Sequence, residues 1–427
     1  MIGCQVYLWG TLVGALVLNK GEQAASFNYE PSFLKSQISL SPIHMPLSER
    51  VYSFPELPFS SFHGLPGLLA DSLPDKYGNA VIDAWCAAQG KDPSSFTPIE
   101  RLCYVGRRGM GALEYVPVIG GKASRNDPLV LDELTQFAAK ILDERSSWSL
   151  HKSNNQMNEL FQISSSAGGA RAKALIALNE TTGEIRSGQV KQQPGFHYYL
   201  IKFDGLSNNK DKEGPDPLHY PLIEYVYSLL AKRSGITMSE CRIKEEGGHY
   251  HFLTKRFDRD DDGNKIMMAS LAGLDHADFN APGSYSYEQG AQVLDELGAG
   301  IDKEEYFRRM VFNVVFRNQD DHVKNISFLM DRLGHWRLAP AYDLTFAYNP
   351  QGLYTAMHQM RIQGKRADIT EQDIEASGRA MGLAGQTIHR IMAQVLDAVP
   401  FWRIEATKMG ISAPIVDAIE SHFVLFK

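Results

Sequence analysis

From residue 284 onward, hydrophobic side chains recur every three or four positions, which is the spacing of helices that bury one face. The pattern predicts helices over residues 284–297, 304–316, 371–381 and 385–401. It is interrupted between residues 318 and 348, where polar clusters alternate with two short apolar runs. The last part of the chain is therefore predicted to be a helical lobe with a polar insert near its start.

The middle third of the chain follows a β pattern. Short apolar runs at residues 175–178 and 198–203, and an alternation over residues 249–257, predict strands. Between them, residues 221–234 have helical spacing with the leucines and a valine on one side. Strands around a single helix predict a small α+β lobe.

The first hundred residues differ from both regions and predict a separate module. Residues 5–16 carry β-type apolar side chains and predict one strand of a hairpin. Residues 67–89 are amphipathic with interruptions at Pro74 and Gly78, and residues 98–104 predict a short helix. We therefore expect three parts, with boundaries at 1–115, 116–258 and 259–427.

Composition narrows the class of protein. Of the 427 residues, 44% are hydrophobic and 22% are charged, as in soluble globular proteins. The net charge of −7 argues against binding nucleic acid through bulk positive charge. No apolar run reaches the ~18 residues of a membrane helix, so no membrane partner is expected. The four cysteines form no C-x-x-C pair, which suits a reducing cytoplasm.

The polar insert carries the residues with the clearest chemistry. Asp320 and Asn325 have the D-x-x-x-x-N spacing of a kinase catalytic loop, and Asp343 follows a hairpin-like stretch at residues 331–336. In phosphate transfer, one carboxylate orients or deprotonates the acceptor hydroxyl, while an amide oxygen and a second carboxylate hold Mg²⁺. The alternative is a solvated turn in which Asp320 or Asp321 caps a helix.

Two features could bind the phosphates of a nucleotide. Residues 164–173 are rich in small side chains, which allow backbone N–H groups to approach phosphate, and Arg171 and Lys173 add positive charge. A flexible linker is an equally good interpretation of this segment. Lys202 lies between apolar residues of a predicted strand, where an anion or Glu224 would compensate its charge, although an edge-strand lysine that reaches solvent fits too.

Other motifs do not support a function. Residues 258–263 match the start of an EF-hand loop, but Ala269 stands where the bidentate glutamate belongs, so a hairpin turn is expected. The histidines lack the i,i+4 spacing of a zinc site and are interpreted as structural: His249, His251, His276 and His322. No G-x-S-x-G or H-E-x-x-H motif indicates a hydrolase.

With these motifs, the sequence resembles the HipA family of bacterial serine/threonine kinases, which are the toxins of HipBA-type toxin–antitoxin modules. The resemblance covers nearly the whole chain and implies an α+β, two-lobed, protein-kinase-like fold with a small β-rich N-terminal subdomain and an all-helical C-terminal lobe. The segments that carry it are Trp9-Gly10 and residues 69–75, 165–173, 256–259, 320–325 and 342–343.

The resemblance also implies roles for single residues. Asp320 would be the catalytic carboxylate, and Asn325 and Asp343 the Mg²⁺ ligands. Ser166 would be autophosphorylated, with Ser165 and Ser164 as the alternatives. ATP would contact residues from both lobes: Gly168, Gly169, Ala170, Arg171, Ala172, Lys173, Lys202, Lys255, Arg256, Phe257, His322 and Lys324. Lys255 departs from the acidic residue expected at its position.

The implied partners are a HipB-like helix-turn-helix antitoxin, operator DNA bound mainly through that antitoxin, and a protein substrate such as glutamyl-tRNA synthetase, an aminoacyl-tRNA synthetase. Two other functions compete with this interpretation. A small-molecule or lipid kinase would use the same carboxylates on another hydroxyl. A co-repressor would strengthen the grip of the antitoxin on DNA without need for catalysis.

Overall fold

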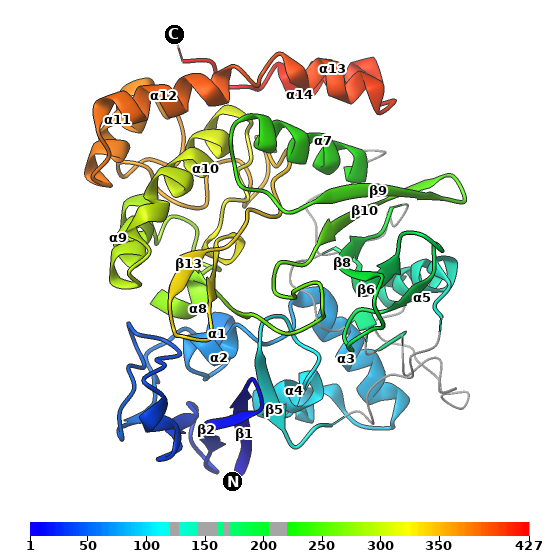
Figure 1. Ribbon diagram of the computed structural model, residues 1–427, viewed down its shortest axis with the longest axis vertical. Coiled ribbons are helices and arrows are strands. Elements are labelled where there is room, and N and C mark those ends of the chain that lie inside the picture. Colours follow the sequence, from blue (N-terminus) through cyan, green and yellow to red (C-terminus); the bar gives the residue numbers. More distant parts are fainter. Residues whose placement is uncertain (120–127, 144–159, 162, 165–170, 205–219, 427) are drawn as a thin grey trace. The chain divides into compact units, whose positions relative to one another are not determined.

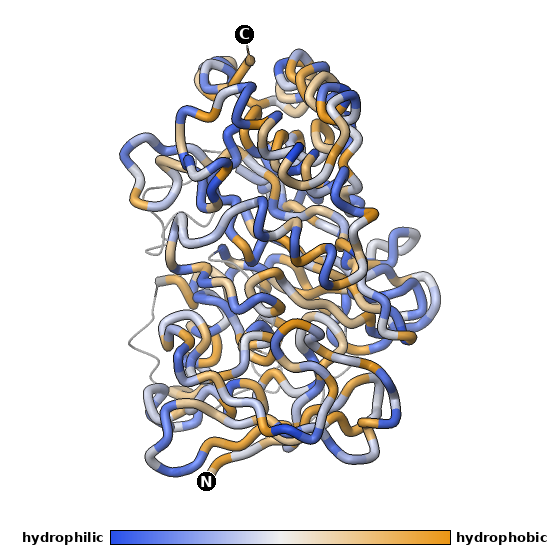
Figure 2. Tube along the Cα trace, turned by 90° about the vertical axis from the view of Figure 1, so that its left-hand side faces the viewer, coloured by the Kyte–Doolittle hydropathy of each residue, from blue (hydrophilic) through white to orange (hydrophobic). Residues whose placement is uncertain are grey.

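The computed structural model describes residues 1–119, 128–143, 160–161, 163–164, 171–204 and 220–426. The chain divides into two compact units. The first unit contains residues 1–40, 47–218 and 242–268, and the second contains residues 41–46, 219–241 and 269–427. No described helix is both long and apolar enough to cross a membrane. Figure 2 shows hydrophobic and hydrophilic positions mixed along the chain trace.

An antiparallel sheet opens the first unit, with strand order β4-β3-β2-β1-β5. Its strands are β1 (Ile2–Leu8), β2 (Thr11–Leu18), β3 (Ser26–Tyr29), β4 (Val51–Tyr52) and β5 (Leu113–Val116). The prediction of a single strand over residues 5–16 is wrong, because a turn divides it. Trp9 and Gly10 both have positive φ, 51° and 83°, as a tight two-residue hairpin turn requires.

Helices α1 (Phe59–Phe62), α2 (Gly67–Ala70), α3 (Lys76–Ala88) and α4 (Pro98–Val105) lie between β4 and β5 in the sequence, and α5 (Leu131–Asp143) follows β5. Short 3-10 turns lie at Phe33–Ser36 and Pro93–Ser95. The amphipathic segment breaks at Pro74, as predicted, and Asp75 caps α3. Gly78 causes no break, because it lies inside the first turn of α3. Thr97 and Glu100 form a capping box that starts α4 at Pro98.

The second sheet of the first unit has the order β7-β6-β8-β10-β9. Its strands are β6 (Lys173–Asn179), β7 (Ile185–Ser187), β8 (Phe196–Lys202), β9 (Cys241–Glu246) and β10 (His249–Lys255). All of them except β7 are labelled in Figure 1. The strand predictions for the middle third are thus confirmed. One apolar core joins β6 and β8 with α3 and α5, and includes the Trp85 and Tyr104 rings, whose centroids are 4.8 Å apart.

The second unit is mainly helical. It contains α7 (Tyr220–Arg233), α8 (Leu271–Asp275), α9 (Tyr287–Glu296), α10 (Lys303–Val315), α11 (Glu371–Ala380), α12 (Gly385–Leu396), α13 (Phe401–Lys408) and α14 (Ala413–Glu420), with 3-10 turns at Gly300–Asp302 and Val323–Asn325. The predicted helix over 385–401 is two helices, because Pro400 cannot donate a backbone hydrogen bond and begins α13.

The helix α7 lies between strands in sequence but packs within the second unit. The ring of Tyr227 on α7 meets that of Trp402 on α13 at 5.7 Å and that of Phe312 on α10 at 6.2 Å. The polar insert between α10 and α11 contains a hairpin of β12 (Ser327–Met330) and β13 (Trp336–Leu338), as predicted. With β11 (Met267–Ser270) it forms a sheet of order β11-β12-β13.

Candidate active site

The loop between α10 and β12 carries two neighbouring aspartates in opposite environments. The side chain of Asp320 is 50% exposed, whereas that of Asp321 is 1% exposed. The Asp321 carboxylate accepts hydrogen bonds from the Tyr287 hydroxyl at 2.8 Å, from His358 Nδ1 at 2.8 Å and from the Gln359 backbone at 2.7 Å. Asp321 therefore anchors the loop to the core and leaves Asp320 directed toward solvent.

A chain of buried hydrogen bonds extends this anchor. Asn318 Nδ2 donates to Asn313 Oδ1 at 2.9 Å, and Asn313 Nδ2 donates to the Tyr287 hydroxyl at 3.0 Å. Burial raises the pKa of Tyr287 well above its ordinary value, and the neighbouring Asp321 carboxylate raises it further. The phenol stays neutral and remains a donor to Asp321. The sequence pattern did not single out Asp321 as the anchor, because its partners come from residues far along the chain.

Asn325 closes the same loop. Its Nδ2 donates to the backbone carbonyl of Asp320 at 2.9 Å, and its backbone N–H donates to the His322 carbonyl at 2.8 Å. With the amide nitrogen used in this way, the amide oxygen faces another direction and can serve as a ligand. His322 Nε2 lies 3.9 Å from the Asp320 carboxylate, and Lys324 Nζ lies 4.4 Å from the centre of the Phe279 ring.

Tyr342 links the segment of Asp343 to this loop. The Tyr342 hydroxyl donates to the Lys324 carbonyl at 2.6 Å and lies 2.6 Å from the Ser327 hydroxyl, which therefore acts as the donor to Tyr342. Asp343 has φ of 56°, a left-handed conformation that aspartate tolerates better than most residues. A cavity of about 20 Å³ is lined by side chains from both segments, including Asn325 and Tyr342. The structure thus brings together the elements that carry Asp320, Asn325 and Asp343.

Two buried lysines meet in the first unit. Lys173 on β6 is paired directly with Lys202 on β8, and they are 1% and 8% exposed. Lys173 Nζ lies 3.2 Å from the carboxylate of Asp75, and Lys202 Nζ lies 5.8 Å from the centre of the Phe252 ring. Arg171 is half-buried and Ala172 is buried. Ser164 is fully buried, whereas Ser165, Ser166, Gly168, Gly169 and Ala170 lie outside the described residues.

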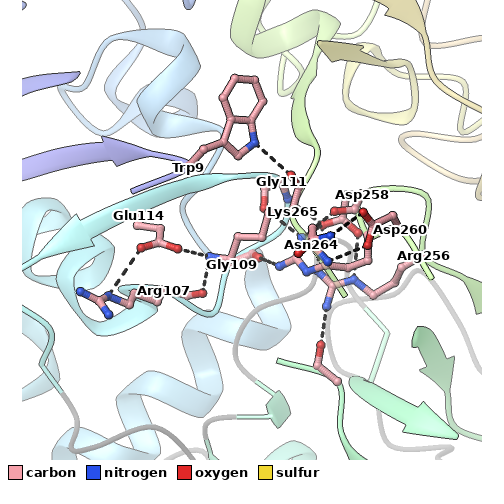
Figure 3. A network of polar contacts seen from close by, with 12 residues as sticks. Trp9, Arg107, Gly109, Gly111, Glu114, Arg256, Asp258, Asp260, Asn264 and Lys265 are labelled. Carbon is pink, nitrogen blue, oxygen red and sulfur yellow. Dashed lines mark hydrogen bonds and ion pairs between the residues drawn. The ribbon is translucent and has the colours of Figure 1, made fainter. Parts of the chain in front are cut away.

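The segment after β10 is held by a cluster of buried charges (Figure 3). The Asp258 carboxylate is fully buried and accepts from Arg256 at 2.7 Å, from Arg259 at 2.9 Å and from the Gly111 backbone at 2.7 Å. Arg256 also donates to the Gly188 carbonyl at 2.9 Å. The guanidinium of Arg256 is therefore used inside the first unit, and its backbone N–H donates to the Tyr198 carbonyl at 2.8 Å, so its backbone carbonyl is the group that could meet a ligand.

The neighbours of Arg256 have simpler surroundings. Lys255 forms an ion pair of 2.8 Å with Asp261, and Phe257 is half-buried. Residues 260–264 form a turn in which the Asp260 carboxylate accepts from the backbone N–H and the side chain of Asn264, at 2.7 and 2.8 Å. This agrees with the predicted hairpin turn in place of an EF-hand.

The histidine and acidic side chains that the structure describes form no metal cluster of their own. Among the residues that the structure describes, no group of three histidine, cysteine, aspartate or glutamate side chains could hold a metal ion. Burial lowers the pKa of His251 to about 4, and its Nδ1 accepts from the Asp204 backbone at 3.2 Å. This histidine is neutral at pH 7 and hydrogen-bonded, as expected of a structural residue.

Two family models match the sequence. The HipA N-terminal domain matches residues 4–116, and the HipA-like C-terminal domain matches residues 165–402, which is more than half of the chain. The fold is similar to a solved structure from Shewanella oneidensis, a complex of HipA, HipB and its operator DNA. The TM-score is 0.68 over 98% of this chain and 95% of that one, at 16% identity. At this identity the likeness concerns the fold.

Two curated relatives are named as candidate kinases. The chain is 27% identical over 150 residues to one from Haemophilus influenzae, a match that covers 30% of this chain and 43% of that protein. It is 25% identical over 370 residues to one from Sinorhizobium fredii, which covers 82% of this chain and 78% of that protein. The chain thus matches less than half of the length of the first relative and most of the second.

Proposed function

Because the chain belongs to the HipA family, we propose that it is an ATP- and Mg²⁺-dependent serine/threonine protein kinase and the toxin of a toxin–antitoxin pair. The observation that carries the proposal is the opposite burial of Asp320 and Asp321 in a D-x-x-x-x-N loop. A merely solvated turn would not need a buried carboxylate with three hydrogen-bond donors beside an exposed one. A loop that presents one carboxylate to a substrate does.

The catalytic loop and the segment of Asp343 each have a proposed role. Asp320 accepts the proton of the substrate hydroxyl and aligns it for attack on the γ-phosphate. Asn325 and Asp343 supply the two oxygen ligands, a donor set that suits Mg²⁺, which keeps waters in its remaining positions. Bound Mg²⁺ would neutralise charge on the phosphate oxygens. Tyr342 holds the Asp343 segment against the loop through the Lys324 carbonyl.

Nucleotide binding is the proposed role of the lysines and the segments around them. Lys173 and Lys202 would meet the phosphates, because two buried ammonium groups on adjacent strands favour an anion between them. His322 and Lys324 would approach from the catalytic loop. Lys255, Phe257 and the backbone of Arg256 would border the adenine. Gly168 to Ala172 would also contact ATP, as the resemblance implies.

Incubation with Mg²⁺ and γ-labelled ATP tests the proposed activity. We expect the wild-type chain to label itself on Ser166 and to label protein hydroxyls. Asp343→Ala should lose most of the label, about 10²-fold or more, because a metal ligand is removed. Asp262→Ala, which removes an exposed carboxylate from the turn after β10, is the control and should label normally.

Three results would contradict the proposal. Equal label on Asp343→Ala and the wild type would exclude the metal site. Transfer to small alcohols with none to protein would indicate a small-molecule kinase. Label that phosphopeptide mapping assigns to Ser164 instead of Ser166 would contradict the assigned site, because the Ser164 side chain is fully buried.

The proposed partners are a HipB-like antitoxin, its operator DNA and a translation protein such as an aminoacyl-tRNA synthetase. The similar fold in a HipA, HipB and operator DNA complex supports the first two. We expect this chain to strengthen the binding of the small DNA-binding protein encoded beside it to its own promoter, measured by mobility shift. An unchanged shift with and without this chain would contradict that role, and Asp320→Asn should leave it intact.

A further inference from the structure

The first turn of α3 is built around Asp75, which makes two different contacts. Its Oδ1 accepts from the Gly78 backbone at 2.7 Å and caps the helix, while its Oδ2 lies 3.2 Å from Lys173 Nζ. The two residues are 98 positions apart, and their side chains are 11% and 2% exposed. The N-terminal module and the β6 strand are therefore joined by a nearly buried ion pair.

This ion pair sits beside a second buried charge. Lys173 and Lys202 occupy directly opposed positions of antiparallel strands, so their side chains leave the same face of the sheet, with Cβ atoms ~5 Å apart. Two like charges at this separation repel each other in a poorly hydrated site. The Asp75 carboxylate offsets the repulsion and fixes the position of the Lys173 ammonium group through this ion pair.

The same helical turn also borders the other end of the predicted phosphate-binding segment. Tyr77, two residues after Asp75, is fully buried, and burial raises the pKa of its phenol above the ordinary value. The Ser164 hydroxyl and the Asp75 carboxylate are the neighbours that influence that pKa most after burial. Tyr77 and Asp75 at the start of α3 thus lie near Ser164 and Lys173, which come before and after residues 165–170 in the sequence.

We propose that Asp75 is a positioning residue for nucleotide binding: from the N-terminal module it sets the place of Lys173 and so the affinity of the chain for ATP phosphates. This rests on the proposed kinase function. A lysine with four rotatable side-chain bonds loses considerable entropy on binding a ligand, and a fixed ion pair removes that cost beforehand. The N-terminal module would then be part of the phosphate site, although it carries no predicted catalytic residue.

The test is equilibrium binding of MgATP to the full chain and five variants. Asp75→Asn keeps Oδ1 for the helix cap, since asparagine caps as well as aspartate, and turns an NH₂ group toward Lys173 in place of Oδ2. We expect it to weaken binding about tenfold, and Lys173→Met to weaken it about 10- to 100-fold. The double variant should match Lys173→Met within about twofold, because Asp75 acts through that lysine.

Two further variants separate positioning from folding. Asp83→Asn removes an ion pair of the same helix, Asp83 with Arg101 at 2.8 Å, on its more exposed face and should bind MgATP like the wild type. Asp75→Glu should recover part of the affinity. Melting temperatures without nucleotide show whether each variant is folded, and the apo Asp75→Asn chain should melt ~5–10 °C lower.

The outcomes are distinct. Unchanged or tighter MgATP binding by a folded Asp75→Asn chain would overturn the positioning role. It would also be overturned if the double variant lost as much binding free energy as the two single variants together. If Lys173→Met bound MgATP normally, Lys173 would not meet the phosphates and the inference would also fail, while the proposed kinase function would stand. If the wild type bound no MgATP, the proposed function itself would fail.

Discussion

Replacing Asp320 with asparagine is expected to lower kcat for phosphate transfer by about 10²- to 10⁴-fold, the usual contribution of a general base. Asparagine has the same size but cannot accept the proton of the substrate hydroxyl. The binding of MgATP should stay within about twofold, since the proposed role of Asp320 concerns the acceptor hydroxyl and not the nucleotide. The melting temperature should not change, because the side chain is half-exposed. Initial rates at several ATP concentrations separate kcat from KM.

Asp321→Asn is the matched control for this prediction. Its carboxylate is 1% exposed and receives three hydrogen bonds, including one from His358. An asparagine there sets an NH₂ group against donors, which costs about 1–3 kcal/mol of stability. We therefore expect Asp321→Asn to melt at a lower temperature. If Asp320→Asn lost stability and kept its rate, the two assignments would be reversed and the catalytic role of Asp320 would be excluded.

Asp258→Asn is expected to cost the first unit about 3–5 kcal/mol of stability, because it leaves the guanidinium groups of Arg256 and Arg259 buried without their carboxylate. Burial alone raises the pKa of Asp258, but the two arginines and the Gly111 backbone N–H reverse this and hold it well below the ordinary value. Urea unfolding measures the change. Asp261→Asn is the control, since Asp261 is 75% exposed and its pair with Lys255 should contribute little.

The difference in stability between the wild type and Asp258→Asn should depend on pH, because the Asp258 carboxylate titrates. Its pKa is lowered on folding, so its contribution is complete above the ordinary carboxyl pKa of ~4 and declines as the pH falls toward the folded value. The free energy of unfolding of the wild type should exceed that of Asp258→Asn by the full ~3–5 kcal/mol at about pH 7, and by less at about pH 3. A margin that grows in acid, or equal unfolding midpoints at pH 7, would contradict the charge cluster in Figure 3.

Local patterns in the sequence predicted most elements of the fold. The helices α7, α9, α10 and α11 and the hairpin β12–β13 follow from hydrophobic spacing within windows of ten to fifteen residues. Where the prediction is wrong, a single residue decided the outcome. Trp9 has a left-handed backbone conformation, which a tryptophan in the sequence does not predict, so the one expected strand is a hairpin.

In the candidate site too, the features set by local spacing could be predicted, and those set by contacts between distant residues could not. The spacing of Asp320, Asn325 and Asp343 is local and could be predicted from the sequence. Which of two adjacent aspartates is buried could not, because the donors to Asp321 lie 34 to 38 residues away. The contact of Asp75 with Lys173 spans 98 residues and has no signature in either segment. Local periodicity contains no information about such pairs.

The division of the chain into units has a consequence for how this protein can be altered. The boundaries fall after residues 40, 46, 218, 241 and 268, so the polypeptide passes from one unit to the other five times. No single cut in the gene yields either unit as one continuous piece. Unlike proteins assembled by fusing complete domains end to end, a chain interleaved in this way exchanges parts with its relatives only by replacing several segments at once.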